Sequence, residues 1–249
     1  MRLLIAIALA ACRFDPHGMQ SDASIAADAP VAVDTRPIDV VDGDPCANDG
    51  CPASCTEVTG LANDSSVTLY LGGSAGQPWT AFCHDDDEYL TVTATANYGQ
   101  YTASTKSPGS NVQTTYGRLR VDPSTLHVDI SDQTFATSVG LLYHDPANNG
   151  SDAVTSMPLG VAMDCAGNNS TTGVAHVDLT GTQFVVASTS TWSTGGNSPG
   201  HSVTSSEGGR IVAITGGGNC GWNAPTGSPG NPFNKFEPAS LLQLAYSPE

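Results

Sequence analysis

Residues 119–130 read LRVDPSTLHVDI and predict the fold class of the chain. Apolar and polar side chains alternate on both sides of DPST, as they do in strands that bury one face. Proline at the second position of DPST favours a tight turn. We therefore expect a β-hairpin here, with strands at 119–121 and 126–130.

The same pattern continues through the rest of residues 55–249. We expect strands at 66–71, 89–95, 210–215 and 241–246. A second hairpin is expected where strands at 175–179 and 183–187 flank Thr180-Gly181-Thr182. No window shows the i, i+3, i+4, i+7 spacing of an amphipathic helix. The sequence predicts one mainly β domain, built either as a sandwich or as a compact multi-sheet fold.

The first residues predict an export signal. Residues 1–11, MRLLIAIALAA, carry one positive charge at Arg2 and then an apolar run that ends in small residues, as secretory signal peptides do. The run is shorter than the roughly 20 residues that span a bilayer. Leu9-Ala10-Ala11-Cys12 resembles the lipobox of bacterial lipoproteins, in which the bond before the cysteine is cleaved and the cysteine is acylated. We expect lipid on Cys12 and a location at the outer membrane or surface of a bacterial cell envelope. An ordinary signal peptide with a chance cysteine is the alternative.

Residues 12–45 predict a flexible acidic linker. They are rich in Ala, Asp, Pro, Val and Ser, with no aromatic residue after Phe14, and such a composition cannot bury enough surface to offset chain entropy. A linker of this length reaches roughly 30 Å on average. The whole chain is also acidic, with 24 Asp and Glu against 8 Lys and Arg and a formal net charge of −16. That charge repels nucleic acid, so we expect no nucleic-acid partner.

The cysteine count agrees with export. Of seven cysteines, lipid on Cys12 would leave six, which can form three disulfides in an oxidising compartment. Residues 46–54, CANDGCPAS, predict a small disulfide loop, because a metal clip would need more ligands than this segment offers. The six cysteines expected in disulfides are Cys46, Cys51, Cys55, Cys83, Cys165 and Cys220.

Three groups of residues suggest metal or acid–base chemistry. The cluster His84-Asp85-Asp86-Asp87-Glu88 offers oxygens to calcium, or an imidazole and carboxylates to zinc; a solvated loop is the alternative. His127 and Asp129 share one strand face, as do His176 and Asp178. Two such strands side by side would form a His/Asp site, whereas solvent-facing polar residues are the alternative. Zinc and calcium are the only cofactors suggested by these residues.

Two glycine motifs and the tryptophans have simpler interpretations. Residues 72–76 match G-x-S-x-G, but a nucleophile elbow needs a helix directly after the serine, so we expect a hairpin loop. Residues 216–221 match G-x-G-x-x-G, but no helix is predicted after them to meet a dinucleotide, so we expect close backbone packing. Exposed tryptophans would form a carbohydrate platform, and buried ones would belong to the core; they are Trp79, Trp192 and Trp222.

Several stretches follow one another in the order and spacing of a known family. They are CTEV (55–58), WTAFC (79–83), EYLT (88–91), NYGQY (97–101), RLRVDPSTLHVDISDQTFATS (118–138), PLGVAMDC (158–165), VDLTGTQF (177–184) and GGGNCGW (216–222). Together they resemble the GON domain, which closes some animal secreted zinc metalloproteases with disintegrin-like and thrombospondin-repeat modules and also occurs in exported bacterial proteins. The resemblance implies disulfides between Cys55 and Cys83 and between Cys165 and Cys220.

The resemblance also carries labels of zinc binding and metallopeptidase activity, which in those proteases belong to a separate catalytic domain. No histidine here stands in H-E-x-x-H, the helical motif that grips zinc. We expect an exported, membrane-anchored module that binds a matrix protein, a cell-surface protein or a glycan without catalysis. A zinc-linked hydrolase built from His and Asp side chains is the alternative, and a purely structural envelope protein is the third. The six histidines are His17, His84, His127, His144, His176 and His201.

Overall fold

The chain folds into strands joined by turns, as the alternation predicts. The structure, a computed structural model, describes Cys46 and residues 50–144, 152–166, 172–196, 201–225 and 241–248. No helix in this part is long and apolar enough to cross a membrane. Its helices are all short 3-10 turns: η1 (Cys55–Glu57), η2 (Leu71–Gly73), η3 (Ala94–Ala96) and η4 (Glu207–Gly209).

Seven antiparallel strands form the first sheet. In order across the sheet they are β1 (Ser65–Tyr70), β2 (Pro78–His84), β3 (Asp87–Thr91), β6 (Arg118–Asp122), β7 (His127–Asp129), β18 (Leu241–Tyr246) and β13 (Phe184–Val186). The predicted hairpin is β6–β7, with Val121 opposite Val128. Its turn is stabilised by the Asp122 carboxylate, which accepts the Ser124 backbone N–H at 2.8 Å.

Nine strands form the second sheet, and two more form a small ribbon. The main path of the second sheet is β14 (Trp192–Gly195), β17 (Trp222–Pro225), β11 (Ala162–Asp164), β4 (Tyr98–Thr102), β12 (Thr172–Asp178), β16 (Ile211–Gly217) and β15 (Ser202–Ser206), and β5 (Val112–Tyr116) and β8 (Ala136–Val139) extend it from β4. The ribbon is β9 (Leu142–His144) and β10 (Asp152–Val154). The mainly β prediction is confirmed.

The second predicted hairpin is wrong. A turn does form after β12, where Thr182 N–H donates to the Leu179 carbonyl at 3.0 Å. However, β12 pairs with β16 and β4, whereas β13 pairs with β18 in the other sheet. Phe184 is fully buried and meets the edge of Trp79 at a ring distance of 5.4 Å. The turn therefore carries the chain from one sheet to the other, where Phe184 lies opposite Tyr246 of β18.

The two large sheets share one hydrophobic core within the described residues. Leu69 and Trp79 of the seven-stranded sheet belong to the same buried cluster as Tyr101 and Ile214 of the nine-stranded sheet. The inner faces therefore bury each other's side chains, and the opposite faces remain for solvent or ligand.

Three glycines let a backbone segment lie directly against the nine-stranded sheet. A Cβ added at Gly99 would lie 1.9 Å from the Pro158 carbonyl oxygen, and one at Gly173 would lie 2.2 Å from the Met163 oxygen. At Gly216, the first glycine of the G-x-G-x-x-G motif, it would lie 2.3 Å from the Ala162 oxygen. The motif leads into β17 rather than a helix, so the expected close packing is confirmed.

Candidate functional site

Three disulfides join the six described cysteines. They link Cys46 to Cys51, Cys55 to Cys83, and Cys165 to Cys220, which are the expected pairs. The predicted signal peptide (1–11), the lipidation site Cys12, the linker (12–45) and His17 lie outside the described residues.

The charge cluster at residues 84–88 forms the hairpin between β2 and β3. Asp85 and Asp86 make the turn with positive φ angles of 47° and 69°. His84 donates from Nδ1 to Asp64 Oδ1 at 2.6 Å, and its Nε2 lies 3.5 Å from Asp85 Oδ2. The hydrogen bond to Asp64, aided by the charge of Asp85, raises the pKa of His84 above its ordinary value.

The last two acids of the cluster point elsewhere. Asp87 pairs with Arg120 at 2.6 Å. Glu88 is buried and accepts the Cys55 backbone N–H at 2.7 Å; burial raises the pKa of its carboxyl. The five side chains diverge because a tight hairpin sends alternate residues to opposite faces. Among the described residues, no three His, Cys, Asp or Glu side chains are placed to hold a metal ion.

One pocket brings parts of two predicted groups together on the seven-stranded sheet. It encloses about 470 Å³, and Asp87, Arg120, Asp122, His127 and Asp129 contribute to its lining. His127 lies opposite Asp122 across β6–β7. Hydrogen bonds, first from the Ser124 hydroxyl, hold the pKa of Asp122 below its ordinary value. The acidic residues of this pocket also make local hydrogen bonds, since Asp129 accepts the Ser131 N–H at 2.9 Å.

The other His/Asp pair lies on a different sheet. His176 and Asp178 are in β12, which is not a neighbour of β7, so the two pairs do not form one site. His176 Nδ1 donates to the Ala96 carbonyl at 2.7 Å, and its ring stacks on Tyr98 with centroids 6.2 Å apart and planes 18° apart. This histidine is therefore held in a fixed orientation on the outer face of the nine-stranded sheet.

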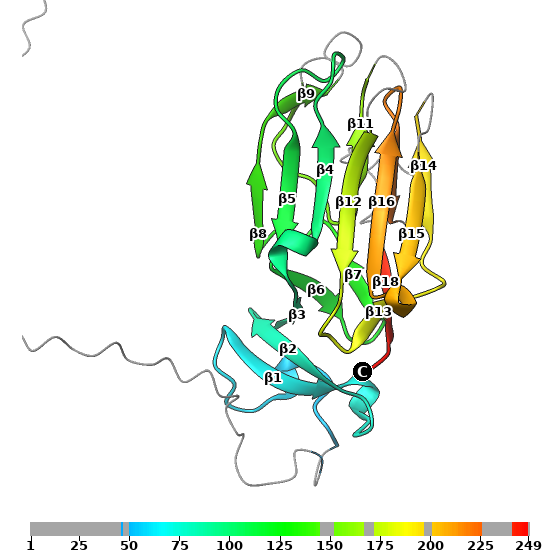
Figure 1. Cartoon of the computed structure of the whole chain (residues 1–249). Helices are drawn as coiled ribbons and strands as arrows, with labels where there is room; N and C mark the ends of the chain where they lie inside the picture. Colours follow the sequence, from blue (N-terminus) through cyan, green and yellow to red (C-terminus); the bar gives the residue numbers. More distant parts are fainter. Residues whose placement is uncertain are drawn as a thin grey trace, which may run out of the picture. The chain divides into compact units, whose positions relative to one another are not determined.

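That outer face forms a continuous surface across neighbouring strands. Six strands lie side by side, β8, β5, β4, β12, β16 and β15 (Figure 1). In the four central strands the inward residues, such as Thr114, Val177 and Ile214, are buried, whereas in the edge strands β8 and β15 the inward Ser138 and Ser205 are exposed. The described outward side chains of all six strands are half-buried or exposed. Among the described outward residues of these strands, Asp178 is the one that carries a charged side chain.

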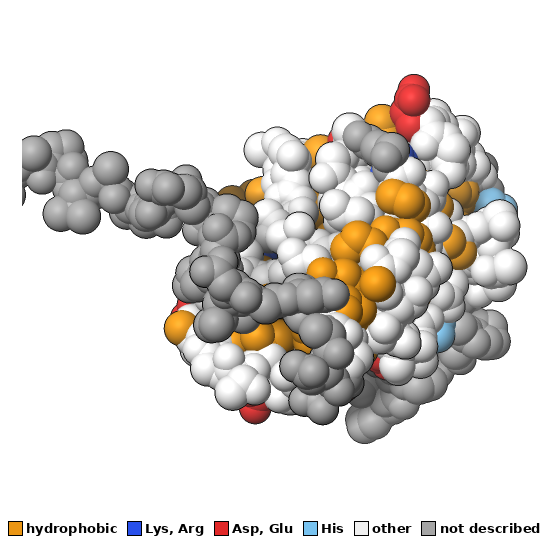
Figure 2. All heavy atoms as spheres, turned by 90° about the horizontal axis from the view of Figure 1, so that it is seen from below, with side chains coloured by type: hydrophobic (Ala, Val, Ile, Leu, Met, Phe, Trp, Pro, Cys, Tyr) orange, Lys and Arg blue, Asp and Glu red, His pale blue; other side chains and the backbone are white. Residues whose placement is uncertain are grey.

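The charge of the protein is therefore unevenly spread. Figure 2 views the domain from below, and there hydrophobic side chains gather near the middle. Sequence reasoning did not single out the outer face. The available signal was the run of uncharged polar residues at alternate positions in β4 and β5, YGQYT and VQTTY, within an acidic chain.

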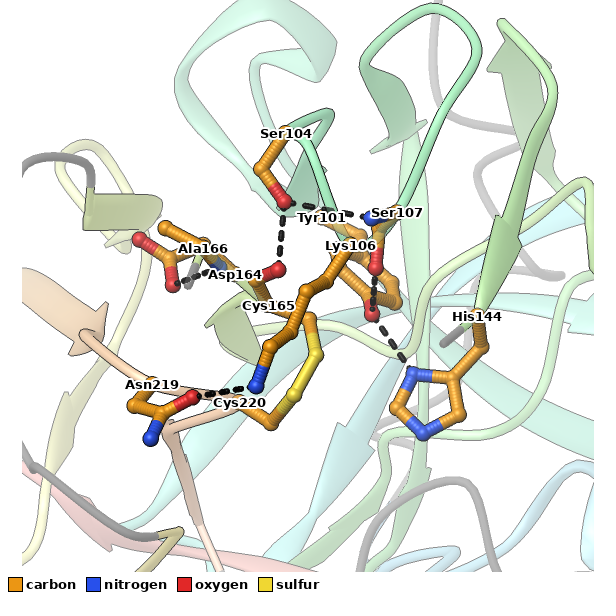
Figure 3. The surroundings of a disulfide bond; sticks show 10 residues. All are labelled: Tyr101, Ser104, Lys106, Ser107, His144, Asp164, Cys165, Ala166, Asn219 and Cys220. Atoms are coloured by element: carbon orange, nitrogen blue, oxygen red, sulfur yellow. Dashed lines mark hydrogen bonds between the residues drawn. A yellow bond between two sulfur atoms is a disulfide. The ribbon is translucent and has the colours of Figure 1, made fainter. Parts of the chain in front are cut away.

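A polar network surrounds the Cys165–Cys220 disulfide (Figure 3). Ser104 Oγ donates to the Cys165 carbonyl at 2.5 Å, and Lys106 Nζ donates to Asn219 Oδ1 at 2.8 Å. These bonds tie the loop after β4 to both ends of the disulfide. We assign this network a structural role.

A tyrosine–histidine pair lies beside this loop, with Tyr101 in β4 and His144 in β9. The Tyr101 hydroxyl lies 2.6 Å from both Ser107 Oγ and His144 Nδ1. Asp164 is fully buried, accepts the Ala166 N–H, and points away from this pair in Figure 3. Asp164 therefore does not form a charge-relay arrangement with Tyr101 and His144. Sequence reasoning named His144 only as one of the histidines.

The remaining candidates have structural positions. Residues 72–76 lie in the loop of the β1–β2 hairpin, as expected. Trp79 and Trp222 are only 1% and 7% exposed, which confirms the core interpretation for both, and Trp192 is half-buried. A Cβ on Gly195 would lie 2.8 Å from the Trp222 ring, so this ring packs against backbone.

Comparison with known families agrees with the sequence resemblance. The family model for the GON domain matches residues 94–230, more than half of the chain, and the chain therefore belongs to the GON domain family. No curated protein and no solved structure matches the chain. The matched region holds all nine strands of the larger sheet, including its outer face.

Proposed function

We propose that this chain is an exported binding module, held to a membrane of a bacterial cell envelope by lipid on Cys12. The acidic linker 12–45 extends the GON domain away from the membrane, and the domain binds an extracellular ligand without catalysis. Three disulfides support export, because disulfides persist in oxidising compartments.

The outer face of the nine-stranded sheet is the observation that carries the binding proposal. A surface that served only solubility would share the charge of the rest of the protein, since charged side chains keep proteins apart in solution. Of the chain's 24 acids, 13 lie among the described residues, yet the described outward residues of six strands include only Asp178 among charged side chains. Such a surface suits contact with a ligand. The His and Asp residues of the hydrolase alternative lie on two sheets, and no geometry among the described residues favours it.

Membrane attachment is tested by Cys12→Ser in the full chain. We expect wild-type protein in the membrane fraction and the variant in the soluble exported fraction, because two or more acyl chains anchor firmly. Ser24→Ala, in the linker, is the control and should stay in the membrane fraction. A Cys12→Ser protein that remains membrane-bound would refute the lipid anchor.

The noncatalytic assignment is tested by elemental analysis of the purified full chain. We expect no stoichiometric metal after dialysis without chelator. Stoichiometric zinc that disappears in His127→Ala or His176→Ala would overturn this assignment and favour the hydrolase.

A further inference from the structure

We propose that the outer face of the nine-stranded sheet binds an uncharged polysaccharide, with the stacked rings of Tyr98 and His176 at the centre of the binding surface. This inference rests on the proposed binding function and names its ligand class.

The register places one continuous row of side chains across six strands. Starting at the free edge of β8, each residue lies opposite the next on the neighbouring strand. Since strands lie about 4.8 Å apart, the row is roughly 24 Å long. All of its members are half-buried or exposed, and they are Thr137, Thr115, Tyr98, His176, Ala213 and Thr204.

The side chains of this row match the surface of a sugar chain. A sugar ring has apolar C–H faces and hydroxyls around its edge, and an aromatic ring supplies a rigid apolar surface with a polar tip. Tyr98 and His176 supply such a surface, and the hydrogen bond from His176 to the Ala96 carbonyl fixes its orientation. Threonine hydroxyls donate and accept, as sugar hydroxyls require.

Two glutamine side chains, Gln113 and Gln100, lie beside this row. Gln113 Nε2 donates to Gln100 Oε1 at 3.3 Å, and Gln100 Nε2 donates to Thr102 Oγ1 at 3.0 Å. These bonds orient the amides before a ligand arrives, so little side-chain entropy remains to be lost on binding. The face is therefore both polar and preorganised.

The charge distribution selects among ligand classes. An anionic polysaccharide would be repelled by a chain of net charge −16. A basic partner would need acidic side chains, and the outward residues offer it only Asp178. The Asp178 carboxylate already accepts the Thr180 N–H at 2.9 Å. A protein interface usually centres on large buried anchors, whereas the one exposed large apolar side chain in the described parts of these six strands, Val139, lies at the end of the edge strand β8. An uncharged polysaccharide is the ligand that fits.

The test is affinity electrophoresis of the detergent-solubilised full chain in native gels that contain dextran, galactomannan or xyloglucan, with alginate as the anionic comparison. We expect at least one neutral polysaccharide to retard the wild type and alginate not to. Ala213→Glu places a charge beside His176 at an exposed position, and Tyr98→Ala removes half of the ring pair; both should weaken retardation at least tenfold. Thr68→Glu, at an exposed position of β1, and Tyr143→Ala, on an exposed tyrosine of β9, are matched controls and should bind as the wild type.

Two results would overturn the inference. One is no retardation by any of the three neutral polysaccharides, and the other is full retardation of Ala213→Glu with melting temperature unchanged. If Ala213→Glu instead abolishes binding to alginate or to a matrix-protein array, the polysaccharide inference fails while the proposed binding function stands. The Cys12→Ser experiment tests the membrane anchor independently of this binding assay.

Discussion

Gly99→Ala tests the close approach of the Pro158 backbone to β4 of the nine-stranded sheet. The new Cβ would lie 1.9 Å from the Pro158 carbonyl oxygen, 3.1 Å from the Pro158 carbonyl carbon and 3.2 Å from the Val161 oxygen. All three are backbone atoms, so no side-chain rotation relieves the clash. Overpacking a core costs about 1–3 kcal/mol, and we expect the upper end, about 3 kcal/mol of unfolding free energy. At about 2–4 °C per kcal/mol for a domain of this size, the melting temperature should fall by about 6–12 °C.

Urea unfolding followed by tryptophan fluorescence under oxidising conditions measures this loss. Gly117→Ala is the matched control, because its Cβ would meet only the Phe135 oxygen at 3.7 Å, an ordinary contact. It should change the unfolding free energy by no more than about 0.5 kcal/mol. A loss below about 1 kcal/mol for Gly99→Ala would refute the reasoning, since it would mean that residues 158–161 can move away without loosening the sheet.

Two further predictions concern the seven-stranded sheet. The double variant Cys55→Ser/Cys83→Ser opens a loop with a sequence separation of 28, and we expect urea unfolding to show a loss of about 3–4 kcal/mol; a loss within error of zero would contradict a stabilising bridge. The hydrogen bond to Asp64 raises the folded-state pKa of His84 above its ordinary value of 6.5, so its stabilisation is full below the unfolded pKa and is lost as pH rises through the folded pKa. Melting temperatures taken between about pH 5 and pH 8 should show this loss, and His84→Gln should flatten it; an unchanged profile in His84→Gln would contradict the assignment.

The sequence predicted strands more successfully than their partners. Residues 241–246 were expected as a strand and form β18, and the hairpin at 119–130 is present as β6–β7. Alternation reports which face of a segment is buried, and a turn motif reports where the chain reverses, so both are local properties. The partner of β13 was missed because β13 pairs with β18, a segment about 60 residues further along the chain, with Phe184 opposite Tyr246.

The candidate site shows the same division. Residues 84–88 looked like one ligand cluster in the sequence, but the hairpin points His84 toward Asp64 and Asp87 toward Arg120. Conversely, nothing in the sequence placed Tyr98 beside His176, because they are 78 residues apart in the chain and the β4–β12 pairing brings them together. Adjacency on a sheet face is created by strand order, which spacing along the chain does not encode.

By itself, the sequence determined the mainly β class, the six cysteines available for disulfides, the GON family and the acidic balance, because these follow from composition, alternation and local motifs. The tertiary structure alone decided that the chain crosses between sheets after β12, that three glycines admit a backbone segment against the larger sheet, and that uncharged side chains from six strands share one face. The physical reason is that burial and register act between residues far apart in the chain, so a surface such as the Tyr98–His176 row exists only once the strands have paired.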